Sequence, residues 1–91
     1  MATIDITRGH GLGRERAREI VERIAQDLIR RYAVQTQWEG DTLLVKRSGI
    51  EGRIEVGEDR VRMHARLGLM VGMLKGTIED AVRRQFEQYF P

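Results

Sequence analysis

The last quarter of the chain constrains the fold most, because it contains a helical stripe that cannot be stable alone. Between residues 67 and 90, apolar side chains recur with the i, i+3, i+4 spacing of a helix that buries one face: Met70, Met73, Leu74, Ile78, Ala81, Val82, Phe86 and Tyr89. An isolated helix of this kind is marginal in water. The rest of the chain must therefore supply an apolar surface that covers the stripe.

A second helix and five alternating segments can supply that surface. The periodicity predicts an amphipathic helix from Arg14 to Tyr32, which Gly11 or Gly13 would cap because no Ser, Thr, Asp or Asn precedes it. Alternating apolar residues predict strands over residues 3–7, 34–38, 42–47, 50–56 and 61–67. Gly52, inside one of these strands, indicates a bulge or the close approach of a helix.

The order of these elements predicts an α+β fold, β-α-β-β-β-β-α, in one domain spanning residues 1–91. Short glycine-containing turns make the last four strands an antiparallel meander. We expect the first strand to pair with the last, which gives a five-stranded antiparallel sheet of order 1-5-4-3-2. Both helices should cover one face, in a TBP-like or helix-grip-like arrangement.

Composition and charge narrow the range of partners. Sixteen basic and fourteen acidic residues give a net charge of +2, and the two signs are interleaved along the chain. The absence of cysteine excludes disulfides and thiolate metal sites. The first residues lack a signal pattern, and no apolar run approaches the ~20 residues that span a bilayer. We expect a cytoplasmic protein without a membrane span.

No set of residues indicates catalysis or a bound cofactor. His10 and His64 lie on different elements without metal-ligand spacing. Glu39 and Asp41 flank a turn glycine, where acidic residues favour the turn itself. The glycines of residues 9–13 lack the G-x-G-x-x-G spacing and do not lead into a parallel βαβ unit. We expect no enzymatic activity, no cofactor and no metal.

The outer face of the last strand carries a row of basic residues, which is an alternative candidate binding site. It consists of Arg60, Arg62, His64 and Arg66. Such a row on an antiparallel sheet is a candidate nucleic-acid surface. However, Glu51 and Glu55 on the adjacent strand are placed to pair with it, and Trp38 falls on the apolar phase, where it cannot stack on bases. A solvated, neutralised ladder is the favoured interpretation.

The segment from Leu69 to Leu74 is the leading candidate for a contact surface. Gly68, Gly72 and Gly76 either form a groove on one continuous helix or mark an apolar loop before a helix capped at Thr77 and Asp80. In both cases Leu69 and Val71 lie off the buried stripe. Methionine-rich apolar patches suit adaptable contacts with apolar partners. The candidate contact residues are Leu69, Met70, Val71, Met73 and Leu74; the alternative is that the segment only closes one end of the core.

Several stretches together carry a family resemblance. I-D-I-T-R-G-H-G-L-G at residues 4–13 resembles the I-x-I-x-R-x-H-x-L-G opening of the small bacterial polyhydroxyalkanoic acid system (granule region) family. W-E-G-D-T-L, R-S-G-I-E-G-R-I-E-V and L-G-L-M-V-G-M-L-K-G-T-I-E resemble later parts of the same pattern, so the resemblance covers essentially the whole chain. Among the matching positions, Arg8 and His10 have no evident folding role, which makes them a candidate polar contact site.

The resemblance implies an accessory role in forming, regulating or coating storage-polyester granules. The partner would be the granule surface or a granule-associated protein. A small helix-grip-like carrier of an apolar ligand is the alternative, and a nucleic-acid-binding regulator is less favoured. Self-association through the solvated sheet face or through the edge strand 34–38 stays open.

Overall fold

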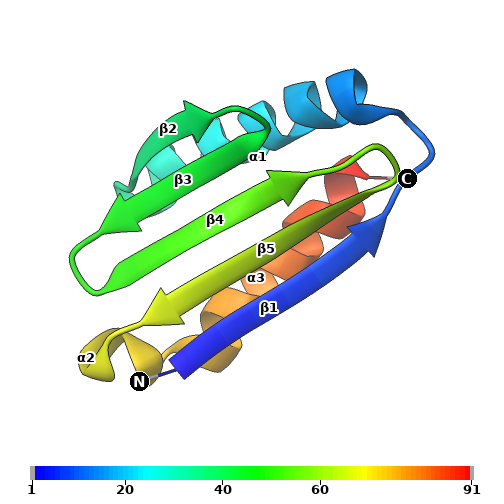
Figure 1. The fold of residues 1–91 in the computed structure, drawn as a ribbon. Helices are drawn as coiled ribbons and strands as arrows, with labels where there is room; N and C mark the ends of the chain where they lie inside the picture. Colours follow the sequence, from blue (N-terminus) through cyan, green and yellow to red (C-terminus); the bar gives the residue numbers. More distant parts are fainter. Residues whose placement is uncertain (1, 91) are drawn as a thin grey trace.

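The computed structural model describes residues 2–90, which form one antiparallel sheet with helices on one of its faces (Figure 1). The elements are β1 (Ala2–Gly9), α1 (Arg14–Tyr32), β2 (Gln35–Glu39), β3 (Thr42–Arg47), β4 (Ile50–Val56), β5 (Arg60–Leu67), α2 (Leu69–Gly72) and α3 (Lys75–Tyr89). The strand order is β1-β5-β4-β3-β2, and every neighbouring pair is antiparallel. The predicted fold class and strand order are confirmed.

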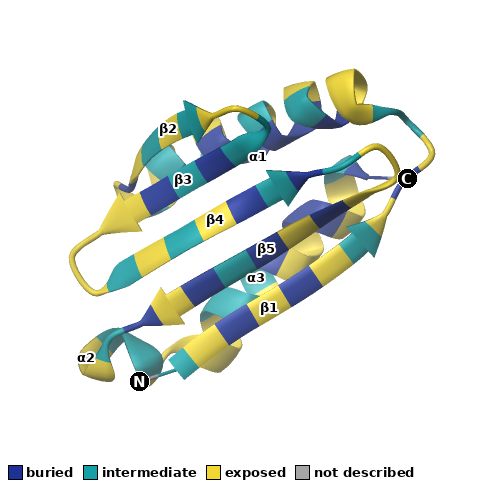
Figure 2. Ribbon diagram, in the orientation of Figure 1, coloured by how far each residue is buried: buried dark blue, intermediate teal, exposed yellow. Residues whose placement is uncertain are grey.

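The core lies between the sheet and the two long helices. Buried and exposed residues alternate along β1 and β5, as Figure 2 shows, and the buried phase faces α1 and α3. α1 contributes six buried residues: Ala17, Ile20, Val21, Ile24, Ala25 and Leu28. α3 contributes Val82 and Phe86, and Phe90 follows directly after it. These side chains fill the space between helix and sheet in which a helix-grip-like carrier would hold its ligand.

The start of α1 follows the sequence prediction. Gly13 is its N-cap residue, with φ of 82° and without a side-chain hydrogen bond to the helix. This positive φ suits glycine, because an L side chain at such an angle is strained.

Gly52 corrects one prediction. The ladder runs through it without interruption, pairing Gly52 with Val45 on one side and Ala65 on the other, so β4 has no bulge. An added Cβ at Gly52 would lie 3.1 Å from the Cβ of Ala65 and 3.2 Å from the carbonyl oxygen of His64. The nearest atoms to such a Cβ therefore belong to strand β5.

The helix boundaries of the C-terminal apolar stripe also differ from the prediction. The chain forms neither one continuous helix nor a loop before a helix capped at Thr77. Instead the short helix α2 ends at Gly72, and α3 begins at Lys75 with Leu74 as an N-cap residue that makes no side-chain cap hydrogen bond. The break between them separates the stripe into two parts that face different ways. Met70, Met73 and Leu74 are exposed, whereas the stripe from Ile78 onward packs on the core.

Candidate functional site

An apolar tip projects at one end of the molecule, where β1 begins and β5 ends (Figure 1). We define the apolar tip as Leu69, Met70, Met73 and Leu74. Their exposed fractions are 82%, 85%, 87% and 56%. Within residues 2–90 they are the large hydrophobic side chains that the structure exposes. Because all of them come from one six-residue stretch, the apolar tip is a concentrated surface and not scattered exposure.

The backbone of α2 is fastened to the sheet beside it. The Gly68 N–H donates to the Gly49 carbonyl at 2.8 Å, which joins α2 to the turn between β3 and β4. Val71 turns inward and packs on the core, so close to Gly49 that a Cβ added there would lie 2.8 Å from the Val71 Cγ2. Gly72 lies against Ala2 in the same way, with 3.4 Å between an added Cβ and the Ala2 Cβ.

Val71 is therefore half-buried, whereas the other four residues predicted for the contact surface are exposed. Its half-buried side chain holds α2 in place, while the four residues of the apolar tip point away. The sequence pattern assigned the residues the other way round, with Met70, Met73 and Leu74 on the buried stripe. The break in the helix, which rotates α2 relative to α3, is the physical reason.

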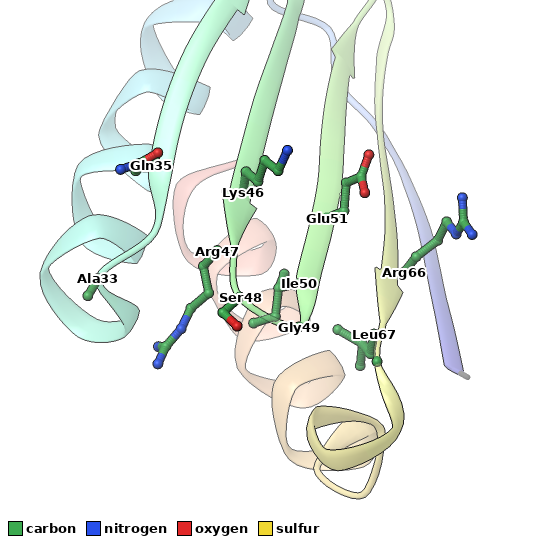
Figure 3. A pocket seen from close by; sticks show the side chains of 11 residues that line it. Ala33, Gln35, Lys46, Arg47, Ser48, Gly49, Ile50, Glu51, Arg66 and Leu67 are labelled. Atoms are coloured by element: carbon green, nitrogen blue, oxygen red, sulfur yellow. The ribbon is translucent and has the colours of Figure 1, made fainter.

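An open groove of about 680 Å³ lies beside α2 (Figure 3). Lys46, Glu51 and Arg66 face one another in a single row across β3, β4 and β5. Arg47 extends from the end of β3 and donates a hydrogen bond to the Tyr32 carbonyl. Ile50, Leu67 and Gly68 complete the side next to α2. The groove thus brings three cationic side chains and one carboxylate close to the apolar tip.

Arg8 and His10 both contact Phe90, the residue that follows α3. The Arg8 Nη2 donates to the Phe90 carbonyl at 3.0 Å. The His10 ring is buried and stacks on the Phe90 ring at 5.6 Å between centroids, and its Nδ1 accepts the Leu12 N–H at 3.3 Å. Within the described residues the His10 Nε2 is buried without a hydrogen-bond partner. These contacts are the folding role that the sequence did not reveal.

The basic row on β5 is interleaved with acidic side chains. Arg62 lies opposite Glu55 and Arg66 opposite Glu51, so the predicted cross-strand neighbours are confirmed in register. The ion pair of Arg62, however, goes to Asp5 on β1, at 2.7 Å. This hydrogen-bonded pair holds the pKa of the Asp5 carboxyl below its ordinary value and raises the pKa of Arg62. Asp5 was not among the predicted partners, because the strand order places β1 beside β5 without giving the register, which sets Asp5 opposite His64 and diagonal to Arg62.

Trp38 faces the helices, as its apolar phase predicted. The Arg18 guanidinium lies 4.4 Å from the centroid of the Trp38 ring. The Trp38 Nε1 donates a hydrogen bond to the Glu22 carboxylate at 2.8 Å. These partners on α1 fasten the ring to the inner side of β2. The indole is therefore not presented beside the basic row, where a nucleic-acid base would need it.

The comparisons with known proteins give one finding. A family model described as "Putative polyhydroxyalkanoic acid system protein" matches residues 4–90. The chain belongs to this family. The match confirms the resemblance and spans both the Arg8–His10 segment and the apolar tip. Neither the curated proteins nor the solved structures compared with this member of the polyhydroxyalkanoic acid system family gave a match.

The remaining candidate residues have structural neighbours. Asp41 lies 3.4 Å from Arg14 and 3.9 Å from Arg18, so it ties the start of α1 to the turn between β2 and β3. Among residues 2–90, no cluster of three or more His, Cys, Asp or Glu side chains could hold a metal ion. Nor does any described helix of this polyhydroxyalkanoic acid system protein have the length and apolar character needed to cross a membrane.

Proposed function

We propose that this member of the polyhydroxyalkanoic acid system family is a non-enzymatic, cytoplasmic accessory protein that docks on the storage-polyester granule through its apolar tip. The observation that carries the proposal is the exposure of four large hydrophobic side chains on one projecting segment. The family supplies the polyester system as the setting. A polyester granule offers an extended apolar surface, which is the kind of partner that an exposed apolar patch fits.

The apolar tip supplies a favourable free energy for docking. Burying one Leu or Met side chain contributes about 1.5–3 kcal/mol, so four of them contribute on the order of 6 kcal/mol. The loss of translational and rotational freedom on binding opposes this gain. Because Val71 and Gly49 already fix the backbone of α2, little further ordering is required when the apolar tip docks.

Co-sedimentation of the purified protein with isolated polyester granules tests the proposal, with latex beads as a general apolar surface. We expect binding to granules that exceeds binding to beads, and loss of granule binding in Met70→Asp/Met73→Asp. Gln88→Asp is a control for an added carboxylate, which it places at an exposed position near the other end of α3. Val71→Asp is unsuitable, since a carboxylate there would disturb the contact with Gly49.

Granule binding that the tip variant retains would overturn docking through the apolar tip. Equal binding to granules and beads would show adsorption without preference for the polyester system. If the protein binds granules only while the granules retain their own proteins, the partner is a granule-associated protein and not the polyester surface.

A further inference from the structure

The end of the molecule that carries the apolar tip has an excess of cationic side chains, although the two signs are interleaved along the sequence. The end that carries the apolar tip collects the last turn of α1, the ends of β3 and β5 and the start of α3 (Figure 1). Six exposed cationic residues lie on these pieces: Arg30, Arg31, Lys46, Arg47, Arg66 and Lys75. The carboxylates among them are Glu51, in the row with Lys46 and Arg66, and Asp27, which is paired with Arg30.

The chain leading into and out of the apolar tip strengthens this asymmetry. From Arg60 to Ile78 the sequence has no acidic residue. The opposite end of the molecule, where the turns after β2 and β4 lie, mixes both signs. Its carboxylates are Glu15, Glu39, Asp41, Glu58, Asp59 and Glu87, and its cations include Arg8, Arg14, Arg16 and Arg60. The end with the apolar tip therefore has the excess of cations over carboxylates.

We propose that this end binds an anionic phospholipid layer, with the apolar tip inserted among the acyl chains and the cationic residues at the level of the headgroups. The proposal rests on the proposed function and names the chemistry of the surface. Apolar side chains alone fit an uncharged surface equally well, whereas the excess of cations at this end is complementary to a surface that carries negative charge. Interfacial binding combines these two contributions, buried apolar area and attraction to anionic lipids.

The groove beside α2 gives the cations a defined place relative to the apolar tip. Lys46 and Arg66 line it together with Ser48, and Lys75 begins α3 directly after Leu74. Glu51 in the same row lowers the net charge of the groove without reversing it. A phosphate group at the membrane surface would meet these side chains while Leu69 to Leu74 lie deeper in the layer.

Sedimentation with vesicles tests the proposal. The two surfaces are phosphatidylcholine alone and phosphatidylcholine mixed with phosphatidylglycerol, at low and at raised salt. We expect binding to the mixed vesicles that weakens as salt is added, because screening reduces the attraction between the cations and the headgroups. A cation near an anionic surface contributes on the order of 1 kcal/mol, so Lys46→Gln/Lys75→Gln should bind about 30-fold more weakly. Arg60→Gln/Arg84→Gln, which removes the same charge elsewhere, should change binding much less.

The outcomes separate this proposal from the proposed function. Equal binding to both vesicles, no binding to either, or equal effects of the two charge variants would overturn the phospholipid proposal. Granule binding without vesicle binding would leave docking on the polyester or its proteins and remove the phospholipid layer as the surface. Vesicle binding without granule binding would support the phospholipid layer and remove the granule function. Retention of vesicle binding by Met70→Asp/Met73→Asp would contradict insertion of the apolar tip.

Discussion

Gly49→Ala should destabilise the protein through two separable effects. Gly49 has φ of 83°, a backbone angle at which an alanine is strained by roughly 1–2 kcal/mol. In addition, the new Cβ would lie 2.8 Å from the Val71 Cγ2, so α2 or the turn must move. Overpacking of this kind costs typically 1–3 kcal/mol. The expected loss in the free energy of unfolding is therefore about 2–5 kcal/mol.

Gly40→Ala separates the two effects, because it shares the strained angle without the contact. Gly40 has φ of 59°, and an added Cβ would meet no atom within 4 Å. We expect this variant to lose only about 1–2 kcal/mol. In a Val71→Ala background, where the Cγ2 is absent, the cost of Gly49→Ala should fall to that of Gly40→Ala.

Urea unfolding followed by the fluorescence of Trp38, the one tryptophan of the chain, measures these differences. Equal losses for Gly49→Ala and Gly40→Ala would refute the contact between α2 and the β3–β4 turn. The apolar tip would then lack the fixed backbone on which the docking argument depends. An unchanged cost of Gly49→Ala in the Val71→Ala background would refute it independently.

Two further predictions concern Phe90, which follows α3, and Asp5, which lies within β1. Phe90→Ala should lower the free energy of unfolding by about 3–5 kcal/mol, because the ring is fully buried against His10 and Phe86. Gln88→Ala, at an exposed position, should change the free energy of unfolding little. Similar losses for the two variants in urea unfolding would contradict the packing of Phe90. Asp5 has a pKa below its ordinary value of about 3.9 because of Arg62, so the pair contributes stability above that pH and loses it as the pH falls through the lowered pKa. Asp5→Asn should therefore be less stable than the wild type at neutral pH and equally stable in strong acid, and a difference that persists in acid would argue against the ion pair.

The long helix and the sheet could be predicted because each sequence pattern fits only one type of secondary structure. α1 begins and ends where the periodicity predicted, since a stripe of buried residues runs without Gly or Pro from Arg14 to Tyr32. Short turns fixed the antiparallel neighbours, and the strand order followed from the lone first strand. The break before α3 could not be predicted, because the apolar residues around Gly72 match helical spacing whether or not the helix is continuous.

The candidate site was predicted only in part. The segment Leu69–Leu74 was identified from its glycines and methionines, but the sequence placed Val71 outward and Met70 inward. Which face of a four-residue helix is covered depends on its contact with Gly49, which is distant in sequence. The roles of Arg8 and His10 escaped prediction for the same reason, since both depend on Phe90 at the other end of the chain.

The most direct test of the account is the granule affinity of Met70→Asp/Met73→Asp relative to Gln88→Asp. Losing the burial of two methionine side chains removes about 3–6 kcal/mol, so the tip variant should bind isolated polyester granules at least about 100-fold more weakly than the control. Urea unfolding of both variants establishes that they are folded. Equal affinity of the two folded variants would contradict docking through the apolar tip.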